Sequence, residues 1–304
     1  MGRIDEALRR SNLDVGRAAG APTQVPGPPA WLFERDEGTD APARARPAGR
    51  PVTETPVERP GPGEARRLAQ SGGFDPGAIE RLVVSKTAGP LLVEQFRSLA
   101  ATLHQAQGER PLKSVIVTSA SPGDGKSHVA VNLALTLSDS YRRRVLLIDA
   151  DLRRPWLHVL FRVSNTCGLG DALKARTDEK VAAVQISETL MLLPSGRPDP
   201  SPLGGLSSDR MKRLVEEAVS RFDWVIVDSP PVGVLADGRL VSETVDAAIL
   251  VVRAGVTRFP DLAAAADTIG REHILGIVLN GVDPVEIRGT EYYNRYYGSK
   301  PDKG

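Results

Sequence analysis

The sequence predicts an α/β fold in which a mostly parallel sheet carries helices on both faces. From about residue 91 onward, helical patterns alternate with short apolar runs, which is the order expected of strand–helix–strand units. The apolar runs are continuous and do not alternate with polar residues, as strands buried on both faces require. A glycine-rich loop also separates the first apolar run from the helix that follows it.

The expected elements follow one another from residue 91 to residue 279. An amphipathic helix over 91–105 places Leu92, Phe96, Leu99 and Leu103 on one side. A buried strand at 113–118 precedes the loop, and a helix at 126–138 follows it. The remaining strands are predicted at 145–148, 190–193, 224–227, 247–252 and 275–279. Two crossover helices are predicted at 208–221 and 261–271.

Composition divides the chain near residue 75. Ten of its 24 prolines lie between Pro22 and Pro62, so this stretch buries too little apolar surface to offset the entropy of ordering. We therefore expect a short amphipathic segment at 1–15 and a disordered proline-rich linker at 16–80. Residues 81–283 are expected to form the folded domain, and residues 284–304 a flexible tail.

Charge and apolar content exclude several classes of protein. Lys and Arg total 39 and Asp and Glu total 38, so no nucleic-acid partner is expected. No apolar run approaches the ~18 to 20 residues of a membrane helix, and residues 1–13 are too charged for a secretory signal. Cys167 is the single cysteine, which excludes an internal disulfide and fits a cytoplasmic location. We expect it to be a small buried side chain.

The loop at 120–127 reads Ala-Ser-Pro-Gly-Asp-Gly-Lys-Ser, which is the spacing of a phosphate-binding loop with alanine in place of the first glycine. Gly123 and Gly125 allow the backbone amides to turn toward phosphates, and the helix N-terminus adds favourable partial charge. Lys126 would reach the terminal phosphates, and Ser127 would bind Mg²⁺. The expected nucleotide contacts from this segment are Ser121, Pro122, Gly123, Asp124, Gly125, Lys126, Ser127 and His128.

Three aspartates follow two of the predicted strands. Asp149 and Asp151 come after the run at 145–148, and Asp228 comes after the run at 224–227. The carboxyl ends of parallel strands meet at the edge where α/β sheets bind ligands, so these carboxylates should lie beside the loop's magnesium. Either of the first two could instead cap a turn. Phosphoryl transfer needs mainly positioning and charge neutralisation. We expect Lys126, Asp149, Asp151 and Asp228 to be catalytic, and Ser127, Asp149 and Asp228 to hold the metal.

Four of the five tyrosines, Tyr292, Tyr293, Tyr296 and Tyr297, fall within the last thirteen residues. Aromatic rings stabilise a fold chiefly by burial, and this tail offers them no apolar neighbours. Their hydroxyl groups are therefore candidate phosphate acceptors. The alternative is that the rings dock on the domain or on a neighbouring subunit.

Together these motifs resemble the bacterial tyrosine kinases of capsule and exopolysaccharide synthesis, which are built on a phosphate-loop ATPase fold. The resemblance covers about residues 91–297 and includes Leu-Ile-Asp-Ala-Asp-Leu-Arg-Arg-Pro at 147–155 and Val-Ile-Val-Asp-Ser-Pro-Pro at 225–231. It implies ATP as donor with Mg²⁺, and autophosphorylation of the four tail tyrosines. It further implies that Asp149 is the base or orients the metal, that Asp151 and Asp228 support Mg²⁺, and that Asn280 reads adenine unless it only caps a turn.

The resemblance also implies partners. A separately encoded membrane protein that regulates chain length would recruit the kinase to the inner face of the plasma membrane and activate it. A neighbouring subunit's tail and other protein tyrosines would be further substrates. Glu94 and Arg97 match the family's Glu-x-x-Arg-x-x-Arg assembly motif, but Ala100 occupies its last position. The full motif would present one polar strip to a neighbouring subunit, and Ala100 removes its second arginine, so we expect weak self-association.

Two other functions compete with the kinase. A partitioning or septum-positioning ATPase would switch dimerisation or membrane attachment and phosphorylate nothing. Such proteins carry a lysine where Ser121 stands, and they lack a tyrosine-rich end. A nucleotide-gated scaffold whose tail binds a partner without being modified is the third possibility.

Overall fold

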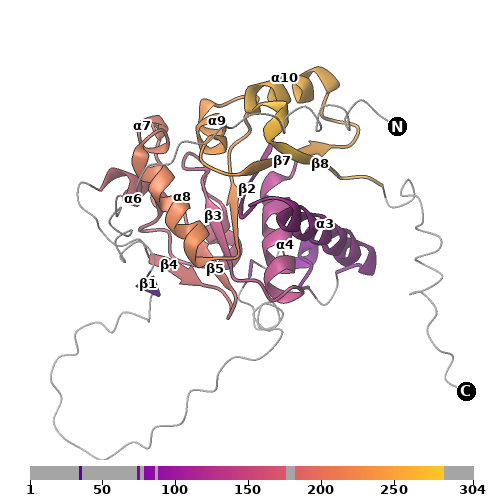
Figure 1. Ribbon diagram of the computed structural model, residues 1–304, viewed down its shortest axis with the longest axis horizontal. Helices are drawn as coiled ribbons and strands as arrows, with labels where there is room; N and C mark the ends of the chain where they lie inside the picture. The colour runs from indigo at the N-terminus through magenta and orange to yellow at the C-terminus, as the bar shows by residue number, and fades with distance from the viewer. Residues whose placement is uncertain (1–33, 36–73, 76–78, 86–87, 176–181, 284–304) are drawn as a thin grey trace, which may run out of the picture.

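The computed structural model describes residues 34–35, 74–75, 79–85, 88–175 and 182–283, and these residues form an α/β fold (Figure 1). Within this part of the chain, eight strands join in one sheet in the order β1-β4-β5-β3-β6-β2-β7-β8. The strands are β1 (Glu34–Arg35), β2 (Ser114–Ser119), β3 (Val145–Asp149), β4 (Ala182–Gln185), β5 (Leu190–Leu193), β6 (Trp224–Asp228), β7 (Ala247–Arg253) and β8 (Ile274–Asn280).

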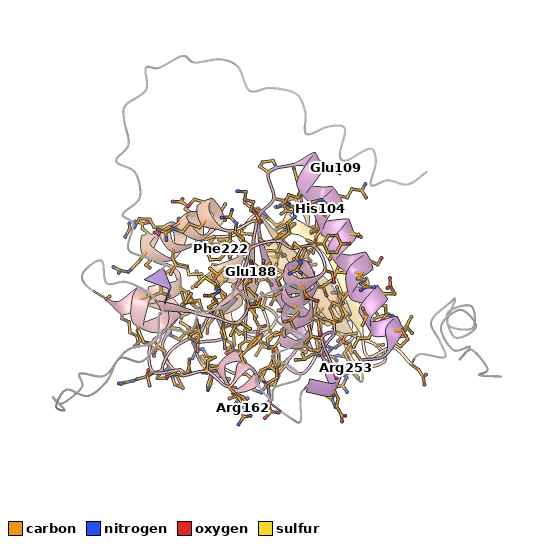
Figure 2. All side chains as sticks on the ribbon, turned by 90° about the horizontal axis from the view of Figure 1, so that it is seen from below. His104, Glu109, Arg162, Glu188, Phe222 and Arg253 are labelled. Carbon is orange, nitrogen blue, oxygen red and sulfur yellow. The ribbon has the colours of Figure 1, made fainter. Side chains whose placement is uncertain are left out.

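All neighbouring strands pair in parallel except β4 and β5, which are antiparallel. The parallel strands therefore end at the same edge. Figure 2 shows this direction: Glu109 and Phe222, which precede β2 and β6, lie toward one end of the molecule, and Arg253, which ends β7, lies toward the other.

Helices cover both faces of the sheet (Figure 1). Apolar side chains of α3 and α4 pack in the core on one face, and those of α8, α9 and α10 pack in the core on the other. The helices described are η1 (Ile79–Arg81), α3 (Pro90–Glu109), α4 (Lys126–Asp139), α5 (Leu157–Phe161), α6 (Leu169–Lys174), α7 (Leu203–Leu206), α8 (Asp209–Arg221), α9 (Ala236–Ser242), α10 (Phe259–Ile269) and η2 (Arg271–His273).

The predicted fold class is confirmed. Each strand expected between residues 113 and 279 is present, and its ends differ by one residue at most. The antiparallel strand β4 and the short helices α5, α6, α7 and α9 were not predicted. The helices are four to seven residues long, which is too short for a helical period to be read from sequence. The strand β4 reads Ala-Ala-Val-Gln, which is not the continuous run of large apolar residues by which β5 was recognised.

Ala100 contradicts the expectation of a polar strip along α3. It is fully buried, on the same side of the helix as Phe96 and Leu103, which lie four residues before it and three after it. Glu94 and Arg97 pair with each other within the helix at 2.6 Å on the exposed side. An arginine at position 100 would face the core and could make no contact on the surface. The alanine found there therefore costs the protein no surface contact.

The expectation for Cys167 is also wrong, because its side chain is exposed. It precedes α6 in a turn where the next two residues, Gly168 and Leu169, take the buried positions.

Residues 74–75 and 79–85, the strap, precede α3 and contribute to the core, and Phe74 lies ahead of the predicted domain start at residue 81. Phe74, Leu82 and Val84 are buried within the cluster that includes α3 and α4. The backbone N–H of Val83 donates to the side chain of Asn132 on α4 at 2.7 Å. The segment at 1–15, most of the linker and the tyrosine tail lie outside the described residues. Among the helices that are described, none is long and apolar enough to cross a membrane.

Candidate active site

The phosphate-binding loop connects the end of β2 to the start of α4. Gly123 and Gly125 have φ values of +87° and +95°, a conformation that side-chain-bearing residues rarely adopt. A Cβ atom on Gly125 would collide with the side-chain amide of Asn280, whose Nδ2 donates to the Asp124 carbonyl at 2.9 Å. The end of β8 is thereby fastened to the loop.

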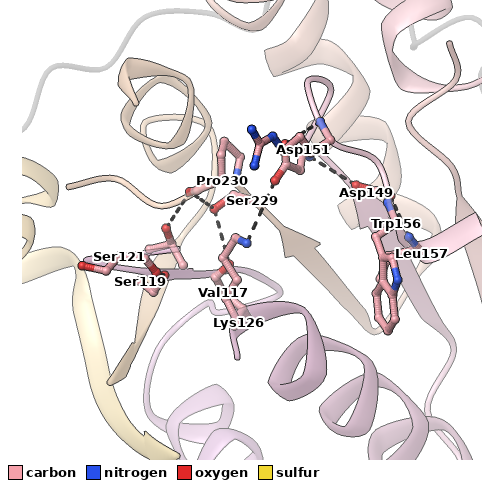
Figure 3. A network of polar contacts seen from close by, with 12 residues as sticks. Val117, Ser119, Ser121, Lys126, Asp149, Asp151, Trp156, Leu157, Ser229 and Pro230 are labelled. Carbon is pink, nitrogen blue, oxygen red and sulfur yellow. Dashed lines mark hydrogen bonds and ion pairs between the residues drawn. The ribbon is translucent and has the colours of Figure 1, made fainter. Parts of the chain in front are cut away.

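The Asp124 side chain holds the loop from within. It is buried, and its carboxylate accepts hydrogen bonds from the Ser121 N–H at 3.0 Å and the Thr257 hydroxyl at 2.8 Å. The Ser119 hydroxyl donates to the Ser121 carbonyl at 2.8 Å (Figure 3). Asp124 is one of the predicted nucleotide contacts, but its carboxylate stabilises the loop. Only its backbone is left to contact a ligand.

Asp149 ends β3 and lies directly across from Asp228, the last residue of β6. Its carboxylate is buried and accepts N–H bonds from Trp156 at 3.1 Å and Leu157 at 3.0 Å on one oxygen, and from Asp151 at 3.2 Å on the other (Figure 3). Burial raises the pKa of Asp149 to about 8, and the charge of Asp228 adds to the rise. The two backbone donors at 156 and 157 oppose it.

Asp228 is buried as well, and burial raises its pKa to about 6. The charge of Lys126 and a hydrogen bond from the Ser127 hydroxyl pull that pKa down. Its Oδ1 atom has no hydrogen-bond partner among the described residues. A buried carboxylate oxygen without a donor is a place for a cation or a ligand donor.

This donor set fits Mg²⁺. In the described part of the chain, no cluster of three or more His, Cys, Asp or Glu side chains could hold a metal ion by itself. Magnesium is usually held by one or two protein groups together with water and substrate phosphates. The Ser127 hydroxyl and the Asp228 carboxylate, next to the phosphate loop, are such a set.

Two cavities meet at the loop. One of about 440 Å³ is lined by Lys126, Ser127, Asp149, Asp151 and Asp228, and so collects every charged group that the sequence predicted to be catalytic. The other, of about 570 Å³, lies against Gly123 and Gly125 and is lined further by His128, Trp156, Arg253, Asn280 and the strap residues Arg81 and Leu82, so Trp156 lines both cavities. Both volumes fall in the range of small-molecule sites.

His128 lies in the second cavity beside the strap. Burial lowers its pKa, and the nearby charge of Arg81 lowers it further. Its ring meets Phe96 edge to face at 6.2 Å between centroids. The imidazole is consequently neutral at pH 7 and adds no charge to the loop.

Several residues of the two cavities were missed from the sequence. Arg153, Arg154 and Trp156 follow the carboxylates in the stretch at 151–156, and Val234 and Leu235 come from the turn after β6. The proximity of Arg153 and Arg154 to Asp151 in sequence was a usable signal. No sequence pattern marks Val234, because only the fold brings that turn to the carboxylates. The predicted acceptors Tyr292, Tyr293, Tyr296 and Tyr297 lie outside the described residues.

Comparison with known proteins finds named relatives of this chain. A family model described as cellulose biosynthesis protein BcsQ matches residues 112–281. The tyrosine-protein kinase YwqD of Bacillus subtilis is 36% identical over 226 residues, which are 73% of this chain and 93% of YwqD. The tyrosine-protein kinase etk of Escherichia coli K12 is 35% identical over 193 residues, 62% of this chain but only 26% of etk.

A solved structure agrees with these relatives. The kinase domain of the Escherichia coli tyrosine kinase ETK superimposes with a TM-score of 0.58 at 34% identity, covering 63% of this chain and 76% of that domain. The chain therefore spans nearly all of one curated relative and about a quarter of the other.

Proposed function

The chain belongs to the bacterial tyrosine-protein kinases, and we propose that it is an ATP-dependent protein-tyrosine autokinase that regulates capsule or exopolysaccharide synthesis and export. The observation that carries the proposal is the single cavity in which the phosphate-loop Lys126 faces Asp149, Asp151 and Asp228. The relatives confirm the predicted kinase family. They give no support to the partitioning-ATPase alternative.

The reaction follows from the chemistry of these groups. The phenol oxygen of the acceptor attacks the γ-phosphorus of ATP, the new O–P bond forms as the bond to the β,γ-bridging oxygen breaks, and ADP leaves. The phenol proton passes to the carboxylate of Asp149. Without a metal, burial raises the pKa of Asp149 to about 8, and a dication bound beside it would favour the carboxylate form that accepts the proton.

Lys126 would neutralise charge on the transferring phosphoryl group, and a bound Mg²⁺ would add to this neutralisation. Ser127 and Asp228 would hold the ion, with Asp149 beside them. Asp151 supports the lysine, since its carboxylate lies 4.0 Å from the ammonium nitrogen. Binding of a dication would also favour the ionised form of Asp228, whose Oδ1 has no other partner among the described residues.

The nucleotide base would extend into the second cavity. This cavity is lined by Asn280, Arg253 and His128 as well as by the two loop glycines. One nucleotide would therefore place its phosphates in the loop and its base beside Asn280. The backbone of Ser121, Pro122, Gly123, Asp124 and Gly125 would bind the phosphates between them.

The acceptors and partners complete the proposal. The tail tyrosines at 292, 293, 296 and 297 would accept phosphate, either from their own subunit or from a neighbour. A separately encoded membrane regulator of chain length would recruit the protein to the inner face of the plasma membrane, and other protein tyrosines would be further substrates. The family resemblance supports each of these steps.

Mapping phosphotyrosine by mass spectrometry tests the proposal. The full chain is incubated with Mg-ATP beside a Lys126→Met control, and phosphate should appear on tail tyrosines in the parent alone. A chain that hydrolyses ATP and carries no phosphotyrosine would be the switch ATPase. A chain that binds ATP without either reaction would be the scaffold.

The route of transfer needs a second experiment. A Lys126→Met chain with an intact tail is mixed with an active chain lacking residues 290–304. Phosphate on the intact tail shows transfer between subunits, whereas its absence shows transfer within one.

A further inference from the structure

We propose that the indole of Trp156 and the side chain of Val234 form a slot that receives the aromatic ring of the acceptor tyrosine. The inference rests on the tyrosine-kinase function proposed above and adds the residues that select the acceptor. Trp156 is 41% exposed and Val234 is 60% exposed, and both line the cavity that holds Lys126 and Asp149. Exposed apolar side chains beside a charged reaction centre are covered when a ligand with apolar surface binds.

The Trp156 wall is fixed relative to the proposed base. The backbone N–H groups of Trp156 and Leu157 both donate to the same oxygen of Asp149, at 3.1 and 3.0 Å. Leu157 is fully buried and begins α5, which holds this loop in the core. Figure 3 shows the Trp156 ring projecting from the loop whose N–H groups bind Asp149.

The Val234 wall is fixed relative to the phosphate loop. The N–H of Val232 donates to the Ser119 carbonyl at 3.0 Å, and the N–H of Val234 donates to the Pro231 carbonyl at 3.3 Å. At Gly233, between them, a Cβ atom would collide with the carbonyl oxygen of Ala120. The turn therefore lies directly against the first residue of the loop.

An ion pair joins the two walls. Arg153, which lies in the loop with Trp156, donates from Nε to Asp237 at 2.6 Å and from a terminal nitrogen to the Pro200 carbonyl at 2.6 Å. Asp237 is buried in the first turn of α9, directly after the turn that carries Val234. The spacing of the slot is consequently set before any acceptor arrives.

The geometry favours a phenol over an aliphatic alcohol. A tyrosine carries its hydroxyl on the far side of the ring from its backbone, so the ring can lie between apolar walls while the hydroxyl reaches Asp149. A serine hydroxyl lies next to its own backbone and would leave Trp156 and Val234 uncovered. The occupant is thus a tyrosine ring of the segment at 292–297, from the same chain or from a second copy.

Kinetics with an added acceptor test the slot. The enzyme is the full chain with its four tail tyrosines changed to alanine, and the acceptor is a peptide of residues 288–300. We expect Trp156→Ala and Val234→Ala each to raise the KM for the peptide roughly tenfold. Val234→Ala should leave the KM for ATP unchanged, whereas Trp156 also lines the cavity proposed for the nucleotide base, so Trp156→Ala is judged on the KM for the peptide alone. Trp156→Phe should restore most of the lost affinity.

Val159→Ala is the matched control, since Val159 is 45% exposed, lies on the adjacent α5, and does not line this cavity. It should leave the KM for the peptide unchanged. A peptide with phenylalanine at the four tyrosine positions should inhibit competitively, and the corresponding alanine peptide should not.

Three results would overturn the slot. One is an unchanged peptide KM in Trp156→Ala and Val234→Ala, another is equal inhibition by the phenylalanine and alanine peptides, and the third is a loss of ATP affinity in Val234→Ala equal to its loss of peptide affinity. If the parent transfers no phosphate to any tyrosine, the proposed function fails separately. The slot is then tested by titrating the phenylalanine peptide against tryptophan fluorescence: a change that disappears in Trp156→Phe supports it, and no change contradicts it.

Discussion

The ammonium nitrogen of Lys126 lies 4.0 Å from the nearer carboxylate oxygen of Asp151, and each side chain is 15% exposed. Lys126 begins α4 and Asp151 follows β3, so the pair links the phosphate loop to the carboxylate edge of the sheet. Burial raises the pKa of Asp228, and the charge of the same lysine offsets part of that rise. An arriving phosphate therefore meets a cation that is already positioned by the groups taking part in the transfer.

Lys126→Met should abolish tyrosine phosphorylation and leave the fold intact. The substitution removes the charge that would face the γ-phosphate, while the 4.0 Å pair with Asp151 is too long to contribute more than about 1 kcal/mol to stability. Phosphotyrosine immunoblotting and thermal unfolding of the same preparation check both parts. Full phosphotyrosine in a folded variant would remove Lys126 from the reaction.

Gly125→Ala should weaken ATP binding roughly tenfold more than Gly123→Ala does. Both glycines have positive φ, so each substitution carries a backbone penalty of about 1–2 kcal/mol, but only position 125 places a Cβ atom against Asn280. Titration with a fluorescent ATP analogue measures the difference.

The double variant Gly125→Ala/Asn280→Ala provides the control for that comparison. Removing the amide relieves the collision but loses the bond to the Asp124 carbonyl, so affinity should recover in part. Equal affinities for the two single glycine variants would show that the contact with Asn280 has no effect on the loop.

Without nucleotide, the free energy of unfolding should fall as pH rises from 6 to 8, and Asp149→Asn should remove this fall. Between pH 3.8 and about 8 the unfolded chain has an ionised Asp149, whereas the folded chain keeps it protonated. The folded state thus binds more protons, and raising the pH favours unfolding, by on the order of a few kcal/mol in total.

The variant should keep a slope below pH 6, because the raised pKa of Asp228 acts in the window from 3.8 to about 6. Urea unfolding across this pH series separates the two residues. A wild-type stability that stays flat or rises between pH 6 and 8 would contradict the protonated state of Asp149. Phosphate transfer by Asp149→Asn should fail at every pH, since the amide cannot accept the phenol proton.

Ala100→Arg should destabilise the protein by roughly 3 kcal/mol or more, because it buries a guanidinium without a partner. Ala101→Arg, at the adjacent exposed position, is the matched control and should change stability by less than about 0.5 kcal/mol. Chemical denaturation compares them. If Ala100→Arg were as stable as Ala101→Arg and formed a larger assembly by light scattering, position 100 would belong to an assembly surface.

The sequence predicted well wherever a local pattern carries the structure. The apolar runs of β3 and β6 and the aspartates that end them were identified because a buried parallel strand requires uninterrupted apolar residues. The loop was recognised from its glycine spacing and from its position between a strand and a helix.

Features that depend on tertiary packing were not predictable in this way. The inward side of α3 at Ala100 could not be assigned, since an alanine fits either face of an amphipathic helix. Asn280 and Asp124 are 156 residues apart in sequence. They meet only because β2, β7 and β8 lie next to one another in the sheet. The same holds for Trp156 and Val234, which come from loops after different strands.

The most direct test of the account follows phosphorus from ATP to tyrosine. The full chain is incubated with Mg²⁺ and ATP labelled at either the γ- or the α-phosphate, and labelled residues are identified after proteolysis. The account predicts label from the γ-position alone, on tyrosines of the segment at 292–297, and none in Lys126→Met or Asp149→Ala. Release of all γ-label as inorganic phosphate, with no labelled tyrosine, would contradict it.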